Sequence, residues 1–154
     1  MSTSDVGLTD VPAFGGLADE HLDSIAGCSV ARNFAAGEYL LREGEPANEC
    51  FAVRHGTISI ETFVPQRGAV TIETLHGGDV LGWSWIFPPH RTVFDARALG
   101  VVRTVAFDAA CLRERCEEDP RLGYELMKRF AEVIAERLQA TRLRLLDVYG
   151  RPGR

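Results

Sequence analysis

Long apolar runs are missing from this 154-residue sequence. None approaches the ~20 consecutive apolar residues that a helix needs to cross a bilayer, and the first residues carry no signal-peptide core. The sequence therefore predicts a cytoplasmic protein with no membrane partner.

Positively charged residues are fewer than negatively charged ones. The 17 lysines and arginines are outnumbered by 22 aspartates and glutamates, so the net charge is -5 at pH 7. A protein that binds nucleic acid by itself usually presents a basic surface, and the charge argues against that class. Arginines do gather near the end of the chain, where we interpret them as a solvated helix face. They are Arg137, Arg142, Arg144, Arg151 and Arg154.

The familiar motifs for metal binding and catalysis are missing too. The four cysteines do not have the spacing of a metal or cluster site, and Cys111 and Cys116 are expected on different faces of one helix. All four are therefore predicted to be free thiols. No histidines form an HxH motif, and Ser84 lacks the G-x-S-x-G setting of a catalytic serine. We expect no metal, no cofactor and no enzymatic activity. The other residues considered are Cys28, Cys50, His21, His55, His76 and His90.

The hydrophobic content of 45% is enough for one domain with a substantial core. The spacing of apolar residues changes along the chain and divides it into helical and strand-rich parts. The predicted parts are a flexible N-terminus (1–11), a single domain (12–149) made of a helix (12–28), a barrel (31–107) and further helices (109–149), and a tail (150–154).

Glycines separate the predicted strands at turns, where a positive φ is often needed. Many short strands at close spacing favour an antiparallel jelly-roll β-barrel over a parallel sheet. The predicted fold class is therefore mainly β, with flanking helices and a long C-terminal dimerisation helix. The predicted strands are 31–34, 39–42, 49–54, 57–64, 70–75, 79–81, 93–99 and 102–107.

The C-terminal helix carries an apolar seam at alternating spacings of four and three residues. The domain is too small to cover such a seam along its whole length, so we expect a homodimer through residues 127–148. The alternative is that the helix lies on its own barrel. The seam positions are Met127, Ala131, Ile134, Leu138, Thr141, Leu145 and Val148.

The segment from Gly78 to Ala96 has the order expected of a small anion pocket. A strand-like run reaches Gly82, a short apolar turn follows, and Arg91 precedes the next strand. Glycine lets backbone N–H groups approach a phosphate, and arginine can hold one with two donors.

These features together resemble the cyclic-nucleotide-binding domain of the Crp/Fnr (catabolite activator) type, without the helix-turn-helix domain that binds DNA. The resemblance covers roughly residues 12–148 and is carried by an ordered set of motifs. Those motifs are the glycine hairpins at 34–47 and 51–58, residues 75–82, and residues 137–141 of the long helix. Residues 75–82 lead into the segment from Gly78 to Ala96, which resembles the family's phosphate-binding cassette and is called the cassette below.

The resemblance implies a ligand-sensing module that binds a cyclic nucleotide in the barrel, with cAMP before cGMP, and signals through the C-terminal helix to an unknown protein partner. No recognition helix fits into residues 150–154, so no specific DNA binding is expected of this chain by itself. The residues that the resemblance assigns to the ligand are Gly82, Trp83, Ser84, Arg91, Thr92, Thr141 and Arg142.

The sequence departs from the family pattern at two positions. The family usually has a glutamate after the cassette glycine to accept the ribose hydroxyl, and Trp83 stands there instead. Losing that charge-assisted hydrogen bond costs about 1.5–3 kcal/mol. The position of the family's phosphate-binding arginine depends on where the alignment starts. Aligned forward from Gly82, Arg91 takes that position and faces the pocket, which we favour; aligned backward from Ala96, His90 takes it. A shift of one residue matters because side chains alternate between the two faces of a strand.

Two further alternatives stay open. The Thr141 hydroxyl either meets a nucleotide base or bonds the carbonyl one helical turn back. Trp83 and Trp85 either border a working pocket or fill the barrel mouth. In the second case the chain is a degenerate member of the fold that binds no nucleotide, or another small anion, and serves as a dimeric scaffold.

Overall fold

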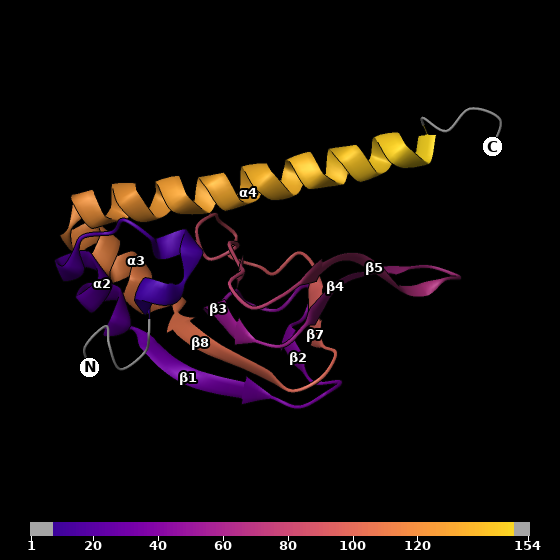
Figure 1. Ribbon diagram of the computed structural model, residues 1–154, viewed down its shortest axis with the longest axis horizontal. Helices are drawn as coiled ribbons and strands as arrows, with labels where there is room; N and C mark the ends of the chain where they lie inside the picture. The colour runs from indigo at the N-terminus through magenta and orange to yellow at the C-terminus, as the bar shows by residue number, and fades with distance from the viewer. Residues whose placement is uncertain (1–7, 150–154) are drawn as a thin grey trace.

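The computed structural model describes residues 8–149, and the predicted tail lies outside them. Two four-stranded antiparallel sheets face each other, in the orders β1-β8-β3-β6 and β2-β7-β4-β5 (Figure 1). This arrangement confirms the predicted jelly-roll fold with flanking helices and a long C-terminal helix. The strands are β1 (Ser29–Phe34), β2 (Tyr39–Leu41), β3 (Glu49–His55), β4 (Ile58–Val64), β5 (Gly68–Leu75), β6 (Val80–Leu81), β7 (Asp95–Ala98) and β8 (Val102–Asp108).

Two apolar clusters make the core. One fills the space between the sheets and includes Phe51, Ile58 and Leu81, all with no exposed surface. The other lies where the helices cover one end of the barrel. Trp83 packs against both clusters, so the cassette lies at the junction of barrel and helices.

The N-terminal part differs from its prediction. Residues expected to be flexible form η1 (Leu8–Asp10), because Leu8 and Val11 are buried in the core. The predicted helix over 12–28 is divided into η2 (Pro12–Phe14) and α2 (Asp19–Ala26). The break falls at Gly15 and Gly16, and Gly16 has a φ of 84° that a helix does not accommodate.

The C-terminal part is helical as predicted, with α3 (Ala109–Glu118) followed by α4 (Pro120–Tyr149). The first turns of α4 bury Leu122, Leu126 and Phe130, which repeat every four residues and face the rest of the domain. Among residues 8–149, no helix combines the length and apolar character that crossing a membrane requires.

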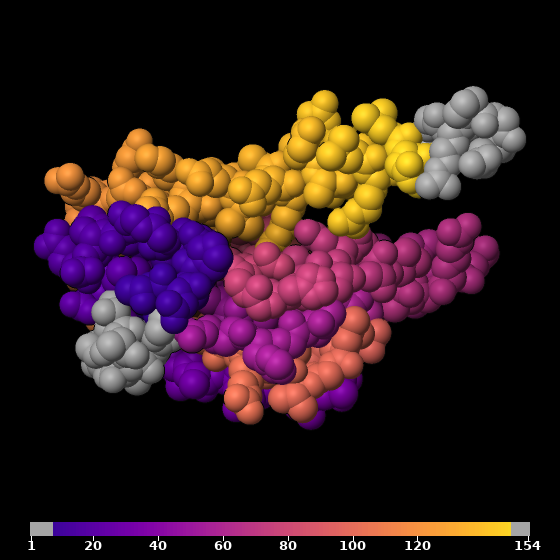
Figure 2. Space-filling view, viewed as in Figure 1, coloured from indigo at the N-terminus to yellow at the C-terminus, as the bar shows by residue number. Residues whose placement is uncertain are grey.

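The second half of α4 extends beyond the helical end of the barrel and runs above the β4–β5 hairpin (Figures 1 and 2). Five of its apolar side chains are more than half exposed. The helix thus lies on its own domain first and leaves an apolar surface uncovered afterwards. The five are Leu138, Leu143, Leu145, Leu146 and Val148.

The prediction that all four cysteines are free thiols is wrong. Cys28 and Cys111 form a disulfide across 83 residues of sequence, while Cys50 and Cys116 are free. Local spacing cannot show this pairing, because it results from the antiparallel contact of β1 with β8.

Candidate functional site

The cassette turns at Gly82, directly after β6. Its φ of 90° lies in the left-handed region, and a Cβ there would come within 3.2 Å of the Glu49 carbonyl oxygen and 3.3 Å of Cys50 Cα. Glycine is therefore needed both for the turn and for the close approach to β3. The turn leads directly into Trp83, which lines the cavity described below.

The two cassette tryptophans have different surroundings. Trp85 is 1% exposed and packs edge-on against Phe130 of α4, with ring centroids 5.5 Å apart. Trp83 is half-buried and makes an edge contact with Phe94 at 5.8 Å. Trp85 is thus part of the core that anchors α4, whereas Trp83 faces the space between α4 and the barrel.

A cavity of about 270 Å³ occupies that space. Its walls come from β4, β5, the cassette and α4, and most of them are apolar. The polar exceptions are Glu73, Arg137 and Thr141. An apolar slot with a few polar groups at its edge is the usual form of a small-molecule site. The apolar lining residues are Ile60, Ile72, Trp83, Phe94, Ile134 and Leu138.

The positive charge of the cavity comes from α4. The Arg137 side chain is 12% exposed, and its guanidinium lies 5.0 Å from the centre of the Trp83 ring. It donates a hydrogen bond to the Val80 carbonyl and approaches a Glu73 carboxylate oxygen at 3.9 Å. Burial lowers the pKa of Arg137, an effect opposed by nearby carboxylates, of which Glu73 acts most strongly.

Arg137 also lies between two hollows. On its other side is a groove of about 710 Å³, bordered by the N-terminal segment, the β5–β6 connection and α4. Glu73 and Arg137 line both the groove and the cavity. A ligand whose body fills the apolar cavity could therefore place a polar part beside Arg137.

Arg91 lines neither the cavity nor the groove. Its side chain is exposed and Nη1 donates to the Gly44 carbonyl oxygen at 3.3 Å. Burial alternates inward through Thr92, Phe94 and Ala96, so Arg91 falls on the outer face. The alignment from Gly82, which directed the Arg91 side chain into the pocket, is therefore wrong about the direction of this side chain. The alignment from Ala96 agrees with the inward and outward positions along the strand, although His90 does not line the cavity.

The remaining predicted residues are only partly brought together. Thr141 lines the cavity, and its hydroxyl donates to the Arg137 carbonyl oxygen at 2.9 Å, the bond one turn back. Ser84 is half-buried and Thr92 is 5% exposed, but neither lines the cavity, and Arg142 is exposed on α4. Of the seven predicted residues, Trp83 and Thr141 reach the cavity wall. Ligand contact by any of the seven stays a prediction.

Sequence reasoning missed most of the wall. Ile134 and Leu138 were assigned to a dimer seam, and Ile60, Ile72 and Phe94 were unremarkable strand residues. Alternation along β7 could have identified Phe94 as inward-facing, because the buried positions are two residues apart. Arg137 was noted within the 137–141 motif, from which it could reach an anion, and among the arginines near the end of the chain, but it was not assigned to the ligand.

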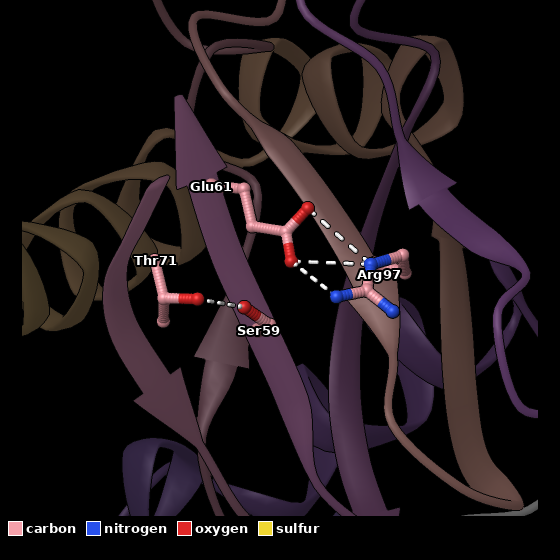
Figure 3. A network of polar contacts seen from close by, with 4 residues as sticks. All are labelled: Ser59, Glu61, Thr71 and Arg97. Carbon is pink, nitrogen blue, oxygen red and sulfur yellow. Dashed lines mark hydrogen bonds and ion pairs between the residues drawn. The ribbon is translucent and has the colours of Figure 1, made fainter. Parts of the chain in front are cut away.

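A polar network supports the barrel wall behind the cavity (Figure 3). Glu61 on β4 is 2% exposed and accepts hydrogen bonds from Arg97 on β7, at 2.7 Å from Nη2 and 3.1 Å from Nε. Ser59 and Thr71 link β4 to β5 through their hydroxyls at 3.0 Å. These contacts hold β4, which carries Ile60 on its inner face, between its two neighbours.

This network predicts a pH dependence of stability. Hydrogen bonding from Arg97 lowers the pKa of Glu61, so the unfolded chain binds more protons at this site and stability rises with pH. The contribution is complete above the unfolded pKa of ~4.3 and is lost as pH falls through the lower folded value. Thermal unfolding of Glu61→Gln should occur roughly 3–8 °C below the unchanged protein at pH 7. The gap should shrink below pH 4, and a gap independent of pH would contradict the assignment.

The comparisons agree with this architecture. The sequence model of the cyclic nucleotide-binding domain family matches residues 31–119, more than half of the chain. This chain belongs to that family, a family of ligand-sensing regulatory modules. The match spans the barrel and α3 and includes the whole cassette.

Known proteins are similar over much of the chain. Cyclic nucleotide-gated ion channel 18 of Arabidopsis thaliana is 34% identical over 122 residues, which are 73% of this chain and 17% of the channel. A cyclic nucleotide-binding domain from Methylobacillus flagellatus superposes with a TM-score of 0.83 at 16% identity, covering 95% of this chain and 85% of that one. The Thermus thermophilus catabolite activator protein gives 0.69 at 20% identity, covering 90% and 63%. The two structures show the shared fold.

Proposed function

We propose that this chain binds a cyclic nucleotide, with cAMP as the first candidate, in the cavity between the barrel and α4. The observation that carries the proposal is the cavity itself, which opens beside the cassette in a chain of this family. Its apolar walls suit the faces of a purine, and the Trp83 ring offers a stacking partner.

Charge supports the same placement. The described residues give the Arg137 guanidinium one hydrogen bond, to Val80, and a carboxylate at 3.9 Å, which is beyond hydrogen-bonding distance. A guanidinium has five N–H donors, so donors remain for a ligand. A buried cation with incomplete compensation favours an anion such as a cyclic phosphate. We assign to Arg137 the phosphate-holding role first given to Arg91.

The ligand would signal through α4. The residues of this helix that border the cavity, from Ile134 to Thr141, span about two turns, so an occupant contacts both helix and barrel. Binding would favour the docked position of α4 over more open ones. An unknown protein partner would then detect the position of the helix.

We further propose that the exposed second half of α4 forms a homodimer, through the part of the predicted 127–148 seam that lies beyond the cavity, because Ile134, Leu138 and Thr141 of that seam line the cavity. Leu145 lies on the predicted seam and Leu143 does not, although both are exposed to a similar degree, at 56% and 57%. Leu145→Asp is expected to give a monomer and Leu143→Asp to leave the dimer intact, measured by light scattering after size-exclusion chromatography. Equal behaviour of the two variants would contradict the seam.

A second candidate function is supported by a specific observation. Trp83 and Phe94 pack together at the barrel mouth, Arg137 closes over them, and Arg91 points away. These contacts also describe a filled pocket in a degenerate member of the fold, which acts as a dimeric scaffold or takes a different small anion. The remaining parts of the proposal are a cytoplasmic location, no enzymatic activity and no specific DNA binding by this chain alone.

Titration calorimetry with cAMP and cGMP separates the two candidates. The first predicts saturable binding to the folded protein, with AMP as a matched control that lacks the cyclic phosphate. Absence of heat with both cyclic nucleotides, from protein with an intact circular-dichroism spectrum, would contradict nucleotide sensing and favour the scaffold or another anion.

A further inference from the structure

The Cys28–Cys111 bond joins two parts of the helical end of the molecule. Cys28 follows α2 and precedes β1, while Cys111 lies in the first turn of α3. The two residues are 83 positions apart, with Cα atoms 5.6 Å apart. The bond therefore attaches the N-terminal helical segment covalently to the helix that leads into α4.

Contacts other than the disulfide already hold these two positions together. Ser29 pairs with Phe107 in the β1–β8 ladder, and the Asp108 N–H donates to the Cys28 carbonyl oxygen at 2.9 Å. The Asp108 carboxylate accepts from the Cys111 N–H at 2.8 Å and caps α3. Because these hydrogen bonds do not depend on the sulfur atoms, reduction leaves the thiols side by side. The bond can form and break without rebuilding the fold.

The pair also differs from the other two cysteines. Cys111 is half-buried in the first turn of α3, and Cys28 is 7% exposed, with its Cα atom 5.6 Å from that of Cys111. Cys50 is 1% exposed, and burial strongly raises its pKa. Burial also raises the pKa of Cys116, with Asp119 and Glu117 adding to the effect. Disulfide formation is directed to Cys28 and Cys111, because these two side chains lie within bonding distance of each other.

We propose that Cys28 and Cys111 are a reversible oxidative modification site that locks α2 to α3. A low-molecular-weight disulfide such as oxidised glutathione supplies the oxidising equivalents. The Cys111 thiolate attacks one of its sulfurs, forms a mixed disulfide and releases one glutathione thiolate. Cys28, as a thiolate, attacks the Cys111 sulfur and releases the second glutathione. Two protein thiols are oxidised, and one glutathione disulfide is reduced to two thiols.

The lock acts on the helix that covers the cavity. Gly27 leaves room for the Arg115 guanidinium of α3, since a Cβ there would come within 3.2 Å of it. His21 on α2 lies 3.5 Å from Asp119, at the junction of α3 and α4. Oxidation therefore joins the end of α2 to α3 by a covalent bond, and α3 leads directly into the start of α4. Disulfides in reducing compartments are commonly of this regulatory kind.

The test needs no nucleotide, so its outcome is independent of the proposed function. The protein is equilibrated in oxidised or reduced glutathione, alkylated after denaturation and weighed by mass spectrometry. We expect two alkylated cysteines after oxidation and four after reduction, and a Tm higher by about 5–15 °C in the oxidised form. Hydrogen exchange of α3 should slow on oxidation.

Cys111→Ser should remove the redox dependence of Tm, whereas Cys116→Ser on the same helix should retain it. If Cys111→Ser does not fold, the comparison of oxidised and reduced wild-type protein still decides. Four alkylated cysteines in both buffers, or equal Tm values for the two forms, would overturn the proposal. A redox response lost in Cys116→Ser and kept in Cys111→Ser would overturn it as well.

Discussion

Replacing Phe130 with alanine is expected to lower the free energy of unfolding by about 3–5 kcal/mol, the usual cost of removing a buried phenylalanine. The Phe130 side chain is 3% exposed, packs against Trp85 and ends the buried face of α4. Its loss leaves a void where α4, the cassette and the helical end meet. The expected decrease in Tm is roughly 6–20 °C, measured by circular dichroism.

Leu143→Ala is the matched control, because Leu143 is on the same helix but 57% exposed. A surface truncation of this kind usually changes stability by less than about 0.5 kcal/mol. Similar Tm decreases in both variants would contradict the account, since they would show that the second half of α4 is held as firmly as the first.

Arg137→Ala is expected to weaken binding of cAMP by roughly 10- to 150-fold, the range for losing a charge-assisted hydrogen bond. The reason is that Arg137 is the buried cation at the cavity, with donors left for an anion. Arg91→Ala should change the affinity less than about threefold, because Arg91 is exposed and bonded to Gly44. Titration calorimetry measures both.

Arg137→Lys refines the same experiment. It keeps the charge but loses the planar guanidinium over Trp83, so binding should be intermediate. Loss of binding in Arg91→Ala together with unchanged binding in Arg137→Ala would place the phosphate on the cassette strand and contradict the assignment. Unfolding curves for each variant separate lost binding from lost structure.

The fold could be predicted because local signals and global arrangement agree. Glycines at turns, short alternating strands and the long apolar helix each specify their own segment, and Gly82 marks a turn that only glycine accommodates well. The N-terminal helix was less predictable, since burial of Leu8 and Val11 depends on contacts with distant parts of the chain. The secondary-structure propensity of a local segment does not predict contacts of this kind.

The cavity was harder to predict than the fold. A shift of one residue in the loop before β7 decides the direction of Arg91, and sequence alone does not specify how the loop absorbs that shift. Arg137 reaches the cavity through the rotation of α4, which is set by Leu122, Leu126 and Phe130 two and more turns earlier. The disulfide likewise depends on strand pairing across 83 residues.

The central claim, that a cyclic nucleotide lies against Trp83 under α4, can be tested directly by NMR. The chain has two tryptophans, so the indole N–H region of a nitrogen–proton correlation spectrum holds two signals, assigned with Trp83→Phe. On addition of cAMP, the Trp83 indole signal should move with saturation, while that of Trp85, 1% exposed in the core, should stay near its position. A Trp83 signal that does not move at saturating cAMP would contradict the account.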